Sequence, residues 1–486
     1  MKEVSNAIVY SVLSAEVDNN NDITNIIDNN HNDDNINDNN ININNEENNN
    51  EMNDKNNKDI SIQDTNTNKR SLLGIEVLIG SHKDVYLLMF TKALRLFAFG
   101  FLAVMLVLYL TEIGLSMETI GMMFSLTLIG DAGISLLITS NADVYGRRKM
   151  LLIGGFLAVI TSFIFMISTN FWILTLVATF GVISPSGNEI GPFMAIELSS
   201  ISEICADKDR TRLMAWYNLL GAFSTAFGSL FCGLLLTIFT NTLHLSLLTS
   251  YRGVLIFYIM IKIILCYYFY QLSPAIETKI NNTTKKSNNI FLGLHKSQMI
   301  VAKLSILFML DSFAGSLILQ SLIVNWFHLV WKTQPSTLGA IIFICNILAG
   351  ISALFAARLA DFIGLIMTMV VTHLPSNVMI MLVPLIPNET LAIVMLCARF
   401  SISQMDVPTR NAFVQEVVCA DERSAANGVT NIVRSIGASI GPYIAGIMYN
   451  DKRLISYPFY IAGILKIIYD LLLLYSFHSV KSSQVS

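Results

Sequence analysis

Charged side chains lie inside stretches of this sequence that are otherwise almost entirely apolar. These stretches are long enough to cross a bilayer as helices of roughly 20 residues. An ionisable group within hydrocarbon is costly unless it meets water or a partner, so we expect each one to line a hydrated path through the membrane. The candidates for contact with a solute or with protons are Arg95, Asp131, Glu189, Asp311, Arg399, Asp406 and Arg434.

The carboxyl groups of Glu189, Asp311 and Asp406 could take up and release protons. Burial disfavours the charged form of a carboxyl group, whereas an approaching base favours it. Movement of a base could therefore be tied to protonation. A proton gradient could in this way drive a change of shape.

Two ion pairs with a purely structural role are the alternative interpretation of some of these charges. Arg95 and Asp131 could pair and lock two neighbouring helices. Lys466 and Asp470 are four residues apart and could pair along one helix.

Prolines interrupt two of the apolar stretches beside an acid. The run Pro185–Pro192 contains two prolines, two glycines and Glu189, and Asp406 is followed closely by Pro408. A helix with this sequence must bend or break, and freed backbone groups are tolerated in a membrane only where protein or a water-filled cavity meets them. We therefore expect Glu189 and Asp406 at equivalent places beside a central cavity. A kink that only shapes packing is the alternative.

The composition is typical of a polytopic membrane protein. The chain has 486 residues, of which 53% are hydrophobic and 14% charged, and it is too apolar for a soluble protein of this length. The net charge of -4 combines an acidic N-terminal tail with a basic remainder. Lysines and arginines in short loops orient a membrane protein, so we expect no nucleic-acid partner. The six cysteines have no zinc-like spacing, and we expect no metal and no cofactor.

Twelve apolar segments follow an Asn-rich tail. We place them at 87–110, 118–138, 150–168, 171–196, 213–238, 252–272, 300–325, 338–357, 365–386, 391–413, 425–448 and 456–476. The fold class is therefore an all-α membrane protein with twelve transmembrane helices in two six-helix repeats.

The segments divide the chain into five parts. Residues 1–86 form a disordered tail, 87–272 the first six-helix half, 273–299 a linker, 300–478 the second half and 479–486 a short tail. Basic residues concentrate in the loops on the side of both termini, which places that side in the cytoplasm.

A short cationic loop from Asn141 to Lys149 separates the second and third segments. It contains Asp143, a helix-stopping Gly146, and Arg147 and Arg148. The guanidinium groups could reach carboxylates or backbone carbonyls of neighbouring helices.

A degenerate copy of this loop occurs 218 residues further along the chain. Asp361 and Gly364 correspond to Asp143 and Gly146, and Gly339 corresponds to Gly121 by the same offset. The arginines have no counterpart in the copy. One offset that explains several positions indicates an internal repeat, as in many secondary transporters.

The loop resembles the signature Gly-x-x-x-Asp-Arg-x-Gly-Arg-Arg of the major facilitator superfamily, although Thr139 and Val144 depart from it. The stretches around Glu189 and Asp406 look like those of a poorly characterised transporter branch of that superfamily. The resemblance implies two halves that rock about a central site and give alternating access to a solute. It also implies a cytoplasmic gate, to which we assign Asp143, Gly146, Arg147, Arg148 and Asp361.

The sequence thus predicts a secondary active transporter for a small organic solute that is coupled to protons. It would act as a monomer in the bilayer, in the plasma membrane or an internal, vacuolar-type membrane. The alternatives are a passive uniporter and a non-transporting membrane receptor or scaffold that uses the Asn-rich tail. The chain has no catalytic motif, and we do not expect an enzyme. The charge of the solute and the direction of coupling stay open.

Overall fold

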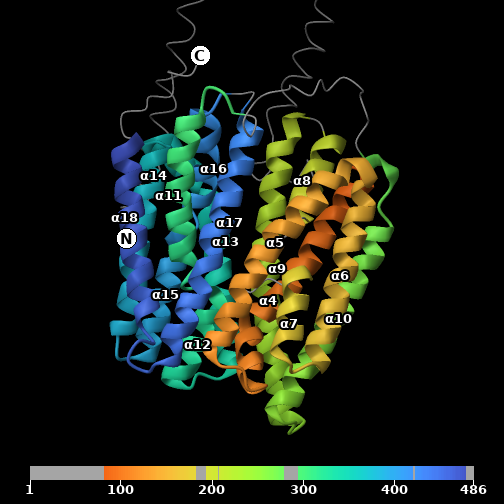
Figure 1. Ribbon diagram of the computed structural model, residues 1–486, viewed down its shortest axis with the longest axis vertical. Helices are drawn as coiled ribbons and strands as arrows, with labels where there is room; N and C mark the ends of the chain where they lie inside the picture. The colour runs from red at the N-terminus through yellow and green to blue at the C-terminus, as the bar shows by residue number, and fades with distance from the viewer. Residues whose placement is uncertain (1–80, 182–192, 206, 278–293, 420–421, 478–486) are drawn as a thin grey trace, which may run out of the picture. The chain divides into compact units, whose positions relative to one another are not determined.

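Helices joined by short turns make up the part of the chain that the structure, a computed structural model, describes. This part comprises residues 81–181, 193–205, 207–277, 294–419 and 422–477, and it belongs to one unit, Leu73–Ser486 (Figure 1). The predicted disorder of the tail, the Pro185–Pro192 interruption with Glu189, most of the linker and residues 479–486 lie outside the described residues.

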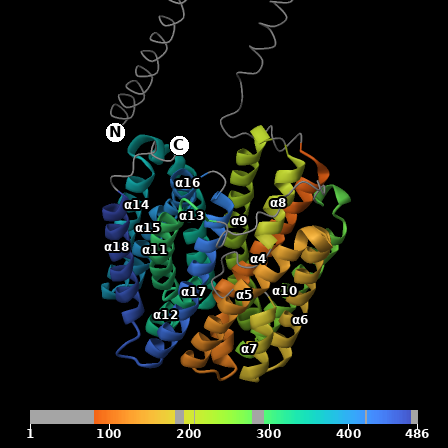
Figure 2. The same ribbon diagram turned by 45° about the horizontal axis from the view of Figure 1, so that its top comes forward.

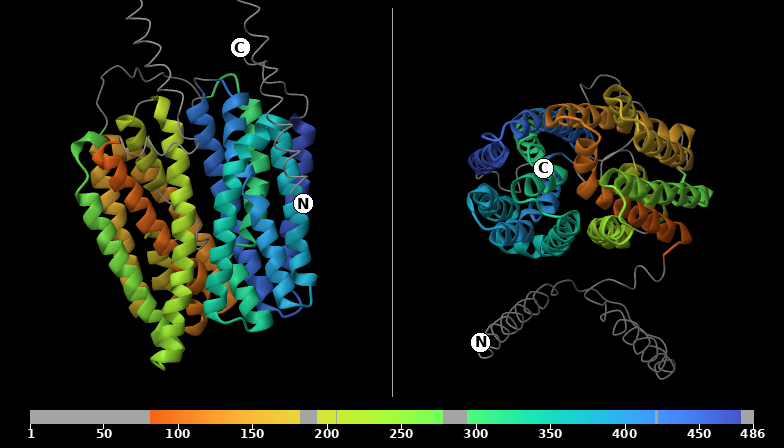
Figure 3. Two further views of the ribbon diagram at one scale, coloured as in Figure 1. Left: turned by 180° about the vertical axis from the view of Figure 1, so that it is seen from behind. Right: turned by 90° about the horizontal axis from the view of Figure 1, so that it is seen from below.

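The first half contains seven α-helices among the described residues. They are α4 (Lys83–Glu112), α5 (Met117–Tyr145), α6 (Arg147–Ile167), α7 (Phe171–Phe180), α8 (Phe193–Ile204), α9 (Asp207–Thr237) and α10 (Leu247–Tyr270). The second half contains α11 (Gln298–Ser316), α12 (Gln320–Trp331), α13 (Pro335–Ile363), α14 (Leu365–Leu382), α15 (Glu389–Ser403), α16 (Asp406–Val417), α17 (Arg423–Asn450) and α18 (Tyr457–Phe477). Each half gathers its helices into its own bundle (Figure 3).

These helices account for the twelve predicted crossings. Within the described residues, ten helical stretches are long and apolar enough to span a membrane. The fourth predicted crossing corresponds to α7 and α8, and the eleventh to α17. Large apolar side chains such as Phe156 (63% exposed) and Trp172 (69% exposed) point outward, as lipid-facing residues do. The predicted fold class is therefore confirmed, although the first helix begins at Lys83, before the predicted end of the tail.

A single glycine replaces each predicted loop at one end of the bundle. Helix α5 continues to Tyr145 and α6 begins at Arg147, with only Gly146 between them at φ 102°. Gly364 separates α13 from α14 in the same way at φ 86°. This backbone conformation favours glycine because a Cβ would clash. The predicted loop Asn141–Lys149 was therefore wrong in extent, because helical residues extend to both sides of Gly146.

We call the end of the bundle with Gly146 and Gly364 the junction end, and the opposite end, where α5 and α13 begin, the far end. Several helices that start at the far end are capped by a Ser or Asn side chain, which accepts a hydrogen bond from an otherwise unpaired backbone N–H. The caps of α5, α7, α10 and α15 are Ser116, Asn170, Ser246 and Asn388.

The two halves meet through small residues. Helix α5 packs on α17, and α9 packs on α13. A Cβ on Gly121 of α5 would lie 3.0 Å from the Cα of Gly446 and would overlap the carbonyl of Pro442, both on α17. A Cβ on Gly339 of α13 would lie 2.6 Å from the carbonyl oxygen of Ser229 on α9. The repeat-related glycines Gly121 and Gly339 thus make equivalent contacts between the halves, as the internal repeat predicts.

These closest approaches lie toward the far end. Two hydrogen bonds between the halves lie there as well, from the Tyr443 backbone N–H to Ser125 Oγ (3.1 Å) and from Asn325 Nδ2 to Met117 Sδ (3.4 Å). In Figures 1 and 2 the ribbons of the two halves converge toward this end and separate toward the junction end.

Candidate functional site

An ion pair with no solvent exposure lies in the first half. Arg95 of α4 donates from Nη1 to Glu197 Oε1 (2.6 Å) and from Nη2 to Glu197 Oε2 (2.8 Å), and both side chains are 0% exposed. The Thr91 hydroxyl donates to Glu197 Oε1 (3.1 Å) and the Tyr217 hydroxyl donates to Oε2. The predicted pairing of Arg95 with Asp131 was therefore wrong. Glu197 stands on α8 and offers both oxygens to the fork of the guanidinium group.

Asp131 lies alone by comparison. The residue is 1% exposed, and neither carboxyl oxygen has a hydrogen-bond partner in the part of the chain that the structure describes. An ionised carboxylate without a partner is costly to bury, whereas a protonated one costs much less.

Two lysines of the first half lie over aromatic rings. Lys92 Nζ is 4.2 Å from the ring centre of Tyr217. Lys262 Nζ is 4.4 Å from the ring centre of Phe99 and 5.0 Å from that of Tyr258. Sequence reasoning missed Lys262, although a single lysine in the middle of the 24-residue apolar helix α10 was a usable signal.

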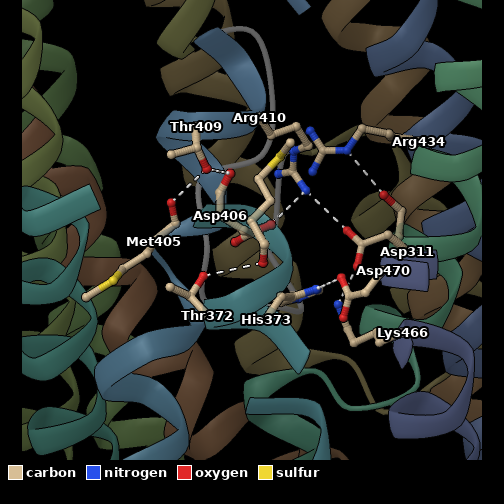
Figure 4. Close-up of polar contacts among 12 residues, drawn as sticks. Asp311, Thr372, His373, Met405, Asp406, Thr409, Arg410, Arg434, Lys466 and Asp470 are labelled. Carbon is tan, nitrogen blue, oxygen red and sulfur yellow. Dashed lines mark hydrogen bonds and ion pairs between the residues drawn. The ribbon is translucent and has the colours of Figure 1, made fainter. Parts of the chain in front are cut away.

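The second half holds a connected network of charges (Figure 4). Asp311 of α11 lies between two bases, with Lys466 Nζ at 2.5 Å from Oδ1 and Arg410 Nη1 at 3.2 Å from Oδ2. The same Arg410 nitrogen lies 3.2 Å from Asp406 Oδ2. Asp311 and Asp406, both predicted as site residues, are thus joined through one guanidinium group, which comes from α16.

Lys466 does not bond to Asp470, and the predicted pair along α18 was wrong. Asp470 instead lies 2.8 Å from His373 Nδ1 and accepts a hydrogen bond from Asn377 Nδ2 at 2.8 Å. His373 and Asn377 were both missed from the sequence. Their spacing of four residues puts them on one face of α14 and could have drawn attention to them.

Two predicted arginines of the second half have no carboxylate partner among the described residues. Arg434 of α17 donates from Nε to Ser312 Oγ (3.2 Å). Arg399 of α15 is 9% exposed, and its side-chain Nε has no hydrogen-bond partner in the described part of the chain. Its guanidinium group lies 4.9 Å from the ring centre of Phe400.

The gate residues Arg147 and Arg148 of the first half are bound to the end of α10 and to the segment that follows it. Glu277 accepts hydrogen bonds from the backbone N–H groups of Arg147 (2.6 Å) and Arg148 (3.2 Å). The guanidinium groups donate to backbone carbonyls, Arg147 Nη1 to Ile276 (3.1 Å) and Arg148 Nη2 to Tyr270 (2.5 Å). The predicted contact with backbone carbonyls is confirmed.

The structure gives no contacts for the side chains of the two acidic residues of the predicted gate, Asp361 and Asp143. Asp361 is exposed, and its side chain makes no hydrogen bond within the described residues. The side chain of Asp143 lies outside what the structure describes.

Replacing Glu277 with alanine should loosen the start of α6. The carboxylate satisfies two N–H groups at a helix N-terminus, and loss of such a cap costs about 1 kcal/mol. We expect about fivefold faster amide hydrogen exchange at Arg147 and Arg148. Glu416→Ala, an exposed acid at the same end, is the control. Unchanged exchange at both amides would contradict the capping role.

No group of three or more His, Cys, Asp or Glu side chains that could hold a metal ion occurs in the described ranges. The site consists instead of charges buried within each of two repeated halves. Two repeated helical halves that each bury charges at membrane depth are typical of secondary transporters. The chain belongs to the Major Facilitator Superfamily, whose family model matches residues 88–442 and 304–485.

Among the similar proteins is the uncharacterized membrane protein YJR124C of Saccharomyces cerevisiae. It is 27% identical over 421 residues, which cover 80% of this chain and 93% of the relative. The chain thus fits a poorly characterised branch of the superfamily.

Solved structures share the fold. A mutant of the nucleoside transporter NupG matches with a TM-score of 0.64 at 16% identity, over 81% of this chain and 99% of NupG. A D-xylose-proton symporter matches with a TM-score of 0.64 at 13% identity, over 83% and 99% of the two chains. A bacterial homologue of the human lysosomal transporter Spinster, in an inward-facing and occupied conformation, matches with a TM-score of 0.64 at 13% identity, over 82% and 96%.

Proposed function

We propose that this chain is a secondary active transporter that moves a small organic solute by alternating access and is coupled to protons. Family membership supports transport, and one similar structure is of a D-xylose-proton symporter. The two halves pack closely toward the far end, so a tilt about these contacts would open and close the junction end. The charge network of the second half joins α11, α16 and α18, so that movement of these helices during the tilt would alter its contacts.

The observation that carries proton coupling is the position of Asp311 between two bases. Lys466 and Arg410 stabilise the ionised carboxylate as long as both stay in place. If solute or the tilt draws one base away, the buried carboxylate loses its compensation and takes up a proton. Proton uptake is then linked to the state of the site, and the linkage acts in both directions.

The other predicted acids have supporting roles in this proposal. Asp406 shares Arg410 with Asp311, so that release of Arg410 affects both carboxylates. Asp131, buried without a partner in the described residues, would be carried as the neutral acid in this conformation. Glu189 stays a candidate on sequence grounds alone.

We assign the gate to Asp143, Gly146, Arg147, Arg148 and Asp361 at the junction end. Basic residues concentrate in the loops there, so this end and both termini would face the cytoplasm. In this conformation Arg147 is held by Ile276 and Arg148 by Tyr270, the last residue of α10.

Asp311→Asn should abolish the response of transport to a pH gradient. Full-length protein in proteoliposomes would first be screened with metabolites and drugs at two pH gradients. Once a transported solute has been identified, we expect Asp311→Asn to lower its uptake against a concentration gradient, driven by the pH gradient, by about tenfold or more. Exchange of solute at equal pH should continue, because the variant still alternates.

Asp451→Asn, an exposed acid at the far end, is the control and should leave uptake unchanged. Gradient-driven uptake that survives in Asp311→Asn would reject this residue as the coupling site. Uptake that never depends on the gradient would favour the passive uniporter. A receptor would transport nothing and would lose its function on removal of residues 1–68.

A further inference from the structure

The buried carboxylates described in the membrane part of the second half already have partners. Asp311 is bound by Lys466 and Arg410, and Asp406 is bound by Arg410. Asp470 is bound by His373 and Asn377. The three carboxylates therefore have little capacity left to balance a further positive charge.

The bases of the same region outnumber these acids. Arg410 and Lys466 are the two that bind carboxylates, and Arg399 and Arg434 are two more that do not. Arginine stays protonated in any protein environment, so neither of the two can lose its charge by releasing a proton. Even with His373 neutral, this region carries more positive than negative charge.

The guanidinium group of Arg434 keeps donors that no described residue accepts. Arg434 donates from Nε to Ser312 Oγ. Among the described residues, none accepts a hydrogen bond from either terminal nitrogen of its guanidinium group. Figure 4 shows its guanidinium group extending toward that of Arg410. Such an approach of like charges inside a membrane protein is unfavourable without an anion beside them.

Arg399 is the more deeply buried of the two, at 9% exposure, and its Nε has no partner in the described part of the chain. Both arginines lie in helices of the second half, Arg399 on α15 and Arg434 on α17. The contact of Arg399 with the Phe400 ring offsets only part of the cost of burying the charge.

We propose that the solute of this transporter is an organic anion, and that Arg434 and Arg399 bind its carboxylate or phosphate group. A guanidinium fork matches the two oxygens of either group with parallel hydrogen bonds. The anion would supply the charge that the second half lacks. The substrate assignment rests on the proposed transport function, whereas the anion site itself can be tested by binding alone.

The test uses pairs of compounds, in which an anion is compared with a neutral compound of related structure. Purified full-length protein would be titrated with D-xylonate and D-xylose, with uridine monophosphate and uridine, and with succinate and succinamide. Binding is followed by the shift in thermal unfolding, and uptake of the same compounds is followed in proteoliposomes. The pairs separate a carboxylate from a phosphate as the recognised group.

We expect at least one anion to bind, and its neutral partner to bind about tenfold or more weakly. Arg434→Gln and Arg399→Gln should each weaken binding of the anion by a similar factor and leave binding of the neutral compound unchanged. Arg434→Lys should recover part of the loss, because it keeps the charge without the fork. Lys303→Gln, an exposed base on α11, is the matched control and should bind as the unaltered protein does.

Several outcomes would overturn the anion site. They are a lack of response to every anion, equal binding of a neutral partner, and an anion preference that persists in Arg434→Gln. Uptake of a neutral compound in such a case would leave the transport function intact. Anion binding that depends on Arg434 but leads to no uptake would uphold the site and reject transport.

Discussion

Gly121→Val should hold the two halves apart at the far end and block transport. The position has no room for a side chain, because a Cβ there would lie 3.0 Å from the Gly446 Cα and would overlap the Pro442 carbonyl. Both obstacles are backbone atoms of α17, so no side-chain rotation can relieve them. Overpacking of this kind costs about 1–3 kcal/mol. Because the cost falls on the conformation with a closed far end, that conformation should become about five- to 150-fold less populated relative to one with an open far end.

The measurement is the accessibility of the far end to a thiol reagent. Ser125→Cys, placed where the hydroxyl of Ser125 accepts a hydrogen bond from Tyr443, would be labelled in a background without the six natural cysteines. We expect labelling from the far side to be several-fold faster in Gly121→Val.

Gly133→Val is a matched control on the same helix. A Cβ on Gly133 would have no neighbour within 4 Å, so valine there should change neither labelling nor uptake. If Gly121→Val labels at the original rate and transports normally, the far-end contact does not control the conformation.

Arg95→Gln should strongly destabilise the first half. The variant would leave Glu197 at 0% exposure without the guanidinium group that binds both of its carboxylate oxygens. Breaking a buried pair by removing one partner costs about 3–5 kcal/mol, because the remaining charge is stranded. We expect a large fall in the temperature of unfolding in detergent and a poor yield of monodisperse protein.

A double-mutant cycle separates the pair from its surroundings. Arg95→Gln/Glu197→Gln should be less destabilised than the sum of the two single variants, because the amides no longer leave a charge unpaired. Lys303→Gln serves as the control for loss of a base outside the pair. Strictly additive effects of the two single changes would show that the two side chains do not depend on each other.

The sequence alone predicted the crossings and the repeat well, because both depend on local composition. Apolar length marks a span whatever its neighbours are, and one offset brought Gly121 onto Gly339 before their shared packing role was visible. The extent of the helices around Gly146 was less clear. Asp143 and Val144 give no sign of whether a helix continues through them, and one glycine proved sufficient for the turn.

The partners of the buried charges could not be predicted in the same way. Depth along a span is readable at 1.5 Å per residue, but the side to which a helix turns depends on its tilt and on packing against other helices. Arg95 could thus be matched in depth with Asp131 and still bond to Glu197. Lys466 likewise reaches across to Asp311, because the interior of the half lies in that direction.

The matching bends at Gly146 and Gly364 bear on how this chain arose. Both copies keep the glycine and its unusual backbone conformation, whereas only the first copy keeps arginines directly after it; the second has Leu365 and Ile366. A duplicated ancestral unit would have carried the bend from the start, because folding of either copy requires it. The two arginines after the glycine, by contrast, serve a role that belongs to the first copy alone. Divergence has thus retained the glycine bend, which the fold of each six-helix unit needs, in both copies. It has retained the arginine pair in only one of the two halves.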